Sequence, residues 1–266
     1  MGQHLMYELS SEEVAFYNSC GFLHLRKVFS SDEVAFQARE LERLMVEWAK
    51  ETAGWQGPWR TEYMTADEDA RSRLTAMHEL QNYSEAFMRA VVHERLTGAV
   101  ADLIGPNVEL HHTTLHAKAP HMGTPFPMHQ DFPFYEHTGA RYVDAILHID
   151  GTNEENGCLK FINGSHIDGP IEHIRGDGTA PHLPTDRYRL EEAVSVPADA
   201  GDVVLFSYYT VHGSAPNRTD QWRRLVRFGY RDPDNAQTAG QGYGRDGWMV
   251  RGQKRNRSGS NRVKQA

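Results

Sequence analysis

The sequence predicts an α+β fold in which helices pack on an antiparallel sheet or barrel. Helix signals dominate up to Gly105, where apolar residues recur at helical spacing behind capping residues. From Val108 onward the chain changes to short segments of alternating hydrophobicity, separated by Gly, Asn, Asp and Pro turns. Helices and strands do not alternate regularly, so the pattern does not favour a parallel sheet.

Two similar helix starts open the chain. Ser10 and Glu13 are spaced as a capping box, and Gly21 offers a left-handed stop before a short strand over residues 22–25. The same pattern recurs at Ser30, which begins a long helix. The likeness of the two starts reflects local helix signals and does not indicate a repeat architecture.

A third helix is predicted over residues 84–103 and ends at Gly105. The segment before it, residues 51–83, shows neither a helical nor a strand period. It carries Trp55 and Trp59, which are costly to leave exposed. Two interpretations have equal weight: a loop that folds over a binding site, or a surface segment with aromatic anchors. We expect the segment to contribute to the mouth of a pocket.

Six strands are predicted in the second half of the chain. They cover residues 108–118, 141–150, 157–163, 193–197, 203–211 and 223–231. The alternation is clearest in 141–150, where one face is apolar (Val143, Ala145, Leu147, Ile149) and the other mixed (Tyr142, Asp144, Ile146, His148). The Gly201-Asp202 turn begins the strand 203–211, which places His212 at its far end.

Two adjacent arginines begin the last of these strands, and strand parity sends Arg223 and Arg224 to opposite faces. The face of Arg224 continues with an apolar row suited to the helical layer: Val226, Phe228 and Tyr230. The face of Arg223 continues with Leu225, Arg227 and Gly229 and suits a polar interior that receives a ligand. Arg227 is therefore a candidate pocket residue, with a structural or surface pairing as the alternative.

Length and composition indicate a single domain over residues 1–250, followed by a basic tail over 251–266. The chain has 266 residues and 39% hydrophobic content, enough for a substantial core. It has no apolar run of transmembrane length, and its N-terminus does not read as a signal peptide. Cys20 and Cys158 form no metal-type cluster, so we expect two reduced thiols in a cytoplasmic protein.

The charge distribution argues against nucleic acid as the main partner. Residues 251–266 hold six basic residues and no acidic one, so the rest of the chain carries 22 basic against 36 acidic residues. An acidic body does not attract a polyanion. We expect a small-molecule substrate and neither nucleic acid nor membrane as a partner, with the tail as a frayed terminus.

One short motif near the middle of the chain suggests chemistry. His129 and Asp131 are two residues apart, so their side chains point the same way on an extended chain. With His212 from later in the chain they form a 2-His-1-carboxylate set, which suits non-haem Fe(II) and leaves coordination positions open. The pair alone is weak, since short His/Asp pairs are common on solvated strand ends.

The order and spacing of further motifs make the interpretation specific. They are Leu103-Ile104-Gly105-Pro106-Asn107, Lys118-Ala119-Pro120, His129-Gln130-Asp131, Glu155-Asn156-Gly157-Cys158-Leu159, Gly164-Ser165-His166, Ala200-Gly201-Asp202-Val203-Val204-Leu205-Phe206, His212-Gly213-Ser214, Asn217-Arg218-Thr219 and Arg223. Together they resemble the phytanoyl-CoA dioxygenase family of Fe(II)/2-oxoglutarate oxygenases, from Leu9 to about Asp232. The resemblance implies a double-stranded β-helix (jelly-roll, cupin-like) core with an N-terminal helical layer.

The resemblance also implies residue roles. His129, Asp131 and His212 match the iron ligands, and Arg223 matches the arginine that binds the distal carboxylate of 2-oxoglutarate. Two further cofactor positions match Ser214 and, in a looser alignment, Thr114. Ile146 lies where some relatives carry tryptophan, so that contact is not transferred. Halogenating relatives replace the carboxylate of Asp131 by a small residue, so its presence here argues for oxygenation.

We therefore expect an Fe(II)- and 2-oxoglutarate-dependent dioxygenase that consumes O₂ and hydroxylates a small metabolite or biosynthetic intermediate. Desaturation, epoxidation or cyclisation are alternative outcomes of the same chemistry. A non-catalytic metal-binding jelly roll, such as a sensor or a lapsed relative, is the alternative from another class. A zinc hydrolase is disfavoured, since no residue presents itself as the general base near a metal-bound water.

Several other polar residues near the motif receive a structural interpretation. The histidines His111, His112, His116 and His121 are expected on the strand surface or as pocket lining, because the ligand set is complete without them. Asp144 and His148 share the parity of Ile146, so lining the pocket is one interpretation and partial exposure on the strand the other. His166 is expected to be structural, and Arg218 and Arg224 to be surface charges.

Overall fold

The structure is a computed structural model that describes residues 7–176 and 178–254. Its helices are α1 Ser11–Cys20, α2 Ser31–Glu47, α3 Arg60–Tyr63, α4 Ala66–Arg71, α5 Glu85–Val91 and α6 Glu94–Ile104. Its strands are β1 Phe22–Leu25, β2 Lys50–Thr52, β3 Leu74–His78, β4 Val108–Lys118, β5 Phe126–His129, β6 Tyr142–His148, β7 Leu159–Phe161, β8 Ile174–Gly176, β9 Thr179–His182, β10 Val194–Val196, β11 Val203–Ser207, β12 His212–Ser214, β13 Arg223–Arg231 and β14 Trp248–Arg251.

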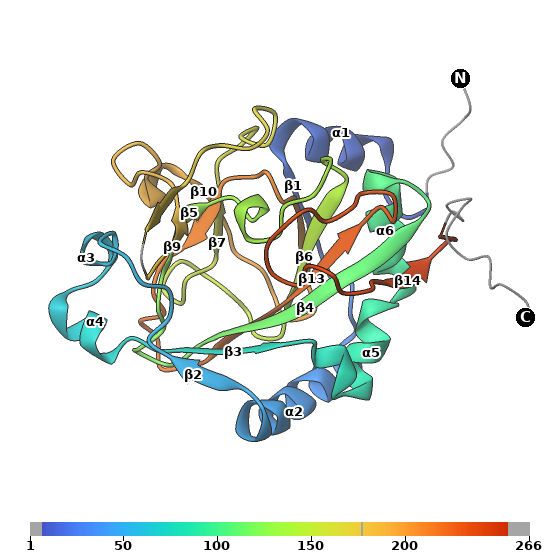
Figure 1. Cartoon of the computed structure of the whole chain (residues 1–266). Helices are drawn as coiled ribbons and strands as arrows, with labels where there is room; N and C mark the ends of the chain where they lie inside the picture. The colour runs from blue at the N-terminus through green and yellow to red at the C-terminus, as the bar shows by residue number, and fades with distance from the viewer. Residues whose placement is uncertain (1–6, 177, 255–266) are drawn as a thin grey trace, which may run out of the picture.

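Two antiparallel sheets form the core, as Figure 1 shows. The larger runs in the order β1-β11-β6-β13-β4-β3-β2, with β14 paired to β4. The smaller runs β10-β7-β12-β5. This arrangement, with helices packed on the larger sheet, confirms the predicted α+β jelly-roll fold.

The two N-terminal capping predictions are confirmed. Ser10 and Glu13 form a complete capping box at α1, and the box at Ser30 is likewise complete at α2. Gly21 ends α1 in the left-handed conformation at φ 85°, and an added Cβ there would clash with His166. L side chains rarely adopt this φ, and the clash leaves no room for a side chain, so both the backbone conformation and the packing at the end of α1 require glycine.

The helix predicted over 84–103 is instead two helices. α5 ends at Val91, and the chain leaves the helical conformation at His93, whose ψ of 126° is extended. The β-branched pair before it disfavours helix continuation. His93 then packs its ring on Phe29, with centroids 4.6 Å apart, so tertiary contact accompanies the break that the sequence period does not reveal.

Two local predictions near the motif are wrong. The strand 203–211 ends at Ser207, and a turn carries the chain across to β12 in the smaller sheet, which His212 begins. Asp131 is not on an extended strand, because β5 ends at His129 and Asp131 has αR backbone angles. In the jelly roll the chain turns sharply after β5, and after β11 it turns to cross from the larger sheet to the smaller one. Local periodicity cannot predict such turns.

The strand β13 separates the apolar layer from the pocket. Val226, Phe228 and Tyr230 pack in the cluster that contains residues of α2, α5 and α6, and the Tyr230 hydroxyl donates to Val91 O at 3.0 Å. Leu225 and Arg227 face the space between the sheets. The structure therefore confirms which residues of β13 were predicted to face the helices and which to face the space between the sheets.

The end of the described chain belongs to the larger sheet. β14 pairs Trp248 with Leu110 and Arg251 with Val108. Of the basic tail expected over 251–266, residues 255–266 lie outside the described residues. Within the described ranges, no helix has the length and apolar character needed to cross a membrane.

Candidate active site

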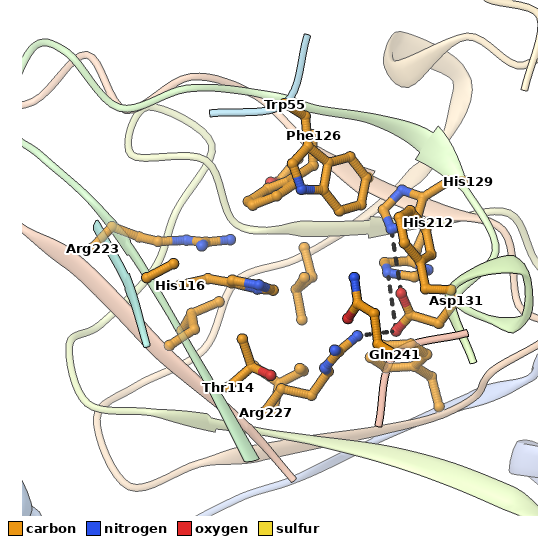
Figure 2. Close-up of a pocket in the computed structure, with 18 of the residues that line it drawn as sticks. Trp55, Thr114, His116, Phe126, His129, Asp131, His212, Arg223, Arg227 and Gln241 are labelled. Carbon is orange, nitrogen blue, oxygen red and sulfur yellow. Dashed lines mark hydrogen bonds and ion pairs between the residues drawn. The ribbon is translucent and has the colours of Figure 1, made fainter. Parts of the chain in front are cut away.

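Three buried side chains converge between the sheets. His129 ends β5 and His212 begins β12, and the two residues face each other in the antiparallel register. Asp131 follows in the turn after β5. One ligand-type atom from each residue lies within 4.8 Å of those from the other two. Figure 2 shows the three side chains pointing toward one another. The structure thus brings together all three residues of the predicted set.

Backbone carbonyls fix the tautomers of both imidazoles. His129 Nδ1 donates to Pro127 O at 2.7 Å, and His212 Nδ1 donates to Thr210 O at 3.0 Å. Each Nε2 therefore carries the lone pair and faces Asp131, at 3.5 and 4.0 Å from its carboxylate oxygens. Burial, followed by the proximity of His129, lowers the pKa of His212 to about 3, which keeps it neutral.

The third member of the set is a carboxylate. Burial raises the pKa of Asp131, but Arg227 and the two histidines outweigh it and hold that pKa well below its usual range. Two neutral imidazoles and one carboxylate are the donors that suit non-haem Fe(II). In metal-binding histidines the ring nitrogen that does not hold the metal typically donates a hydrogen bond to a carbonyl or carboxylate, as both Nδ1 atoms do here. The residues present therefore fit an iron ion.

The triad opens into a cavity of about 100 Å³. Residues of both sheets and of three loops line it: Trp55, Ala76, His78, Thr114, His116, Phe126, His129, Asp131, Phe134, Ile146, Leu159, Phe206, His212, Gly213, Ser214, Arg223, Leu225, Arg227 and Gln241. The lining combines apolar and aromatic side chains with a few polar groups, as small-molecule sites do. All six predicted site residues line this one cavity.

Arg223 extends into the cavity on the side away from the triad (Figure 2). It is buried, its Nε donates to Gly157 O at 3.2 Å, and within the described ranges it forms no ion pair. Burial lowers its pKa to about 9, so it remains a cation at neutral pH. Arg224, by contrast, is paired with Asp150 through two bonds of 2.8 and 2.7 Å.

Ser214 and Thr114 line the same cavity, each with a polar neighbour. The buried Lys118 ammonium donates to Ser214 Oγ at 2.7 Å and to Ala215 O at 2.5 Å. Since that contact occupies a lone pair of the Ser214 hydroxyl, its proton is free to point into the cavity. Thr114 Oγ1 lies 3.2 Å from His78 Nδ1. Sequence reasoning did not assign Lys118 a role, although it belongs to one of the quoted motifs.

The clustered histidines have different positions. His116 lines the cavity, whereas His111 and His112 lie in a buried network behind Asp131. His121 is exposed and contacts Arg218 O. The prediction of strand surface or pocket lining therefore holds for His116 and for the surface position of His121, and is wrong for His111 and His112, which are buried and do not line the cavity.

Neither sequence interpretation of Asp144 and His148 is correct. Both side chains are fully buried, and neither lines the cavity. Asp144 accepts from the Tyr135 hydroxyl at 2.8 Å, and burial together with Asp131 raises its pKa well above the usual range. The alternation placed them on the correct face of β6, but the strand lies deep between the sheets.

Three outer residues differ in how far the sequence interpretation holds. His166 bonds Asn18 O at 3.1 Å and packs beside Gly21, a structural role. Arg218 pairs with Glu68 on the surface. Arg224 is half-buried rather than a free surface charge, because Asp150 and Glu42 hold it.

Trp55 and Gln241 reach the cavity from two loops that are far apart in the sequence, one after β2 and one after β13. Trp55 packs on His129, Phe126 and Phe134, with ring centroids 4.8 to 4.9 Å apart. The segment 51–83 thus contributes to the cavity wall, also through His78. Gln241 carries no sequence signal, because its placement depends on the loop after β13 folding back over the pocket.

A buried 2-His-1-carboxylate set inside a jelly roll is the arrangement of non-haem Fe(II) oxygenases. The family model for phytanoyl-CoA dioxygenase (PhyH) matches residues 17–225, and the chain belongs to this family. It is an Fe(II)- and 2-oxoglutarate-dependent dioxygenase acting on a small molecule.

Individual relatives are distant. The chain is 26% identical to a 2-aminoethylphosphonate dioxygenase from the uncultured bacterium HF130_AEPn_1, over 85% of this chain and 82% of the relative. It is 24% identical to the ectoine dioxygenase of Stutzerimonas stutzeri (strain A1501), over 86% and 78%.

Solved structures share the fold. The carbocyclase SnoK from nogalamycin biosynthesis superposes with a TM-score of 0.71 at 24% identity, over 91% of each chain. The epimerase SnoN in complex with Fe³⁺, alpha ketoglutarate and nogalamycin RO gives 0.69 at 22% identity, over 91% of this chain and 96% of that one.

Proposed function

We propose that the protein hydroxylates a small metabolite or biosynthetic intermediate, with His129, Asp131 and His212 as its iron ligands. The two Nε2 atoms and the Asp131 carboxylate support this assignment, since they lie close together in the buried space between the sheets. The Nδ1 atom of each histidine and Oδ2 of Asp131 already have hydrogen-bond partners in the protein. When bound there, Fe(II) supplies the redox chemistry that couples decarboxylation of 2-oxoglutarate to oxidation of the substrate.

Arg223 is the cosubstrate anchor in this proposal, and the observation that carries the assignment is that no residue in the described part of the chain gives it an acidic partner. A buried guanidinium without a carboxylate is costly, and a bound dicarboxylate relieves that cost through a two-bond contact. The Ser214 hydroxyl, with its lone pair held by Lys118, donates toward the same ligand. Thr114 lines the cavity beyond them.

The cavity supports a small substrate with an apolar or aromatic portion. Trp55 and Phe134 form a wall beside His129, and Gln241 offers an amide without a hydrogen-bond partner among the described residues. Relatives named for phosphonates and ectoine act on small molecules, which supports the same size class. An acyl-CoA fits less well, because the body of the protein is acidic.

We also propose that residues 1–250 form one catalytic domain in the cytoplasm. Pairing of β1 with β11 and of β14 with β4 supports a single unit, since it joins the first and the last strand of the described residues to one sheet. Cys20 and Cys158 are free thiols, which favours a reducing compartment. Limited proteolysis should leave one core fragment.

Succinate formation from 2-oxoglutarate, with Fe(II) and O₂ supplied, tests the function. His129→Ala, Asp131→Ala and His212→Ala should each abolish turnover while the circular dichroism spectrum stays that of the parent. The exposed His121→Ala serves as the matched control and should retain full activity. Wild-type turnover by the Asp131→Ala protein would exclude this ligand assignment, and no turnover by the parent would favour a non-catalytic metal-binding protein.

A further inference from the structure

The two oxygens of Asp131 have different neighbours. Oδ1 lies 3.5 Å from His129 Nε2, on the side where the ligand atoms converge. Oδ2 accepts a hydrogen bond from Arg227 NH1 at 3.0 Å, and this contact is dashed in Figure 2. It is also 4.0 Å from His212 Nε2. A charge-assisted bond thus occupies Oδ2, while Oδ1 faces the ligand-type nitrogen of His129.

The guanidinium of Arg227 also has contacts other than the one with Asp131. It donates to the Tyr135 hydroxyl at 3.1 Å and to His112 Nε2 at 2.8 Å, and it stacks over the Tyr135 ring at 5.1 Å. All of these groups are buried. Arg227 is therefore fixed in place independently of Asp131, and it can impose an orientation on the carboxylate rather than follow it.

The histidines continue this support outward. Because Arg227 donates to His112 Nε2, the proton of His112 lies on Nδ1 and points to His111 Nδ1 at 2.8 Å. His111 Nε2 then donates to Gln237 Oε1 at 2.9 Å. Gln237 in turn donates to Gln241 O at 2.7 Å, in the loop that brings Gln241 to the cavity. The Tyr142 hydroxyl also lies 2.8 Å from His111 Nδ1, so it shares this acceptor with His112.

We propose that Arg227 is a positioning residue that restricts Asp131 to binding the metal through one oxygen. A carboxylate can bind a cation through one or both oxygens. Binding through both would occupy a position that the cosubstrate or O₂ requires. By holding Oδ2, Arg227 keeps that position open. This inference rests on the proposed function, since it assumes that the triad holds the metal.

Co(II) titration of the intact chain under exclusion of oxygen tests this role, because the visible bands of Co(II) respond to coordination number. Arg227→Met should bind Co(II) with a changed spectrum. Its affinity for 2-oxoglutarate should fall by roughly tenfold or more, because the released second oxygen of Asp131 would compete for the position that the cosubstrate requires. Arg227→Lys, which keeps the charge but loses the planar fork, should give an intermediate spectrum and affinity.

Arg231→Met is the matched control. Arg231 lies on the same face of β13, is equally buried and is paired with Glu109 at 2.8 Å, but it does not touch Asp131. It should lose stability and keep the parent Co(II) spectrum. If both arginine-to-methionine variants and Arg227→Lys keep the parent spectrum and 2-oxoglutarate affinity, Arg227 has only a structural role. A parent protein that binds neither Co(II) nor 2-oxoglutarate would instead overturn the proposed function itself.

Discussion

Arg223 and Arg224 are neighbours in sequence but have opposite electrostatic surroundings. Arg223 is 1% exposed and, among the residues that the structure describes, its side chain is bonded only to a backbone carbonyl, whereas two carboxylates hold Arg224. A guanidinium already satisfied by Asp150 has little to gain from a further anion. The unpaired one has a full charge-assisted contact to gain, so only Arg223 is suited to capture a dicarboxylate.

This contrast predicts different effects on cosubstrate affinity. Arg223→Ala should weaken 2-oxoglutarate binding by on the order of ten- to a hundred-fold, because a lost charge-assisted pair costs about 1.5–3 kcal/mol. Arg224→Ala should lower stability slightly and leave that affinity nearly unchanged. Isothermal titration of both variants with 2-oxoglutarate and a redox-inert metal measures the difference. Equal losses, or a larger loss at Arg224, would contradict the assignment.

At the residue scale, the sequence was informative wherever the spacing along the chain determines the geometry. The parity of β13 distinguished Arg223 from Arg224, and the motif spacing brought His129, Asp131 and His212 into one set. The contact between Arg227 and Asp131 was not predictable. It depends on where the corner after β5 meets β13, and strand periodicity contains no information about such a crossing.

At the element scale, the corners were harder to predict than the strands. The long strands β4 and β13 lie at their predicted positions, since each has the length to show a period. The short strands β5 and β12, which carry the two histidines, have four and three residues and show none. Their pairing fixes the site, and it is a long-range property of the jelly roll.

The segment between β2 and β3 is the element that we expect to respond to ligands. Trp55 packs its ring on His129 and Phe134, so the segment forms part of the wall beside the proposed iron ligands. Binding of metal and 2-oxoglutarate should slow chymotryptic cleavage within residues 51–63, because opening of the segment would break those contacts. Mass spectrometry of the fragments locates the cuts.

Trp55→Ala supplies the control for this prediction. The variant lacks the aromatic anchor, so ligands should no longer protect the segment, while cleavage elsewhere in the chain stays as in the parent. Identical cleavage of residues 51–63 in the parent with and without ligands would mean that the segment is a fixed wall and not a lid.

At the scale of the whole molecule, several imidazoles are buried in the neutral form. Burial lowers the pKa of His148 and of His111 to about 3, and those of His137 and His173 to about 4. In the unfolded chain each titrates near its ordinary value of about 6.5. The fold therefore holds these side chains in a state that water would not favour in mild acid.

The consequence is a loss of stability on acidification that begins well above the range of the carboxylates. Between about pH 6.5 and about pH 4 the unfolded chain binds more protons than the folded one, so the free energy of unfolding falls as the pH falls. Each such histidine contributes a slope of up to about 1.4 kcal/mol per pH unit. Urea unfolding of the metal-free protein between about pH 7.5 and about pH 5 measures the slope before most carboxylates titrate.

The substitution His148→Phe measures the contribution of one buried histidine to this pH dependence of stability. Residue 148 is fully buried and lies outside the cavity, so an aromatic ring of similar shape removes the titrating group without touching the proposed iron ligands. The variant should lose less stability than the parent between about pH 7 and about pH 5, by on the order of 1–2 kcal/mol. His121→Phe, at an exposed position, should leave the slope unchanged. Equal pH slopes for the parent and His148→Phe would show that His148 is not held neutral by burial.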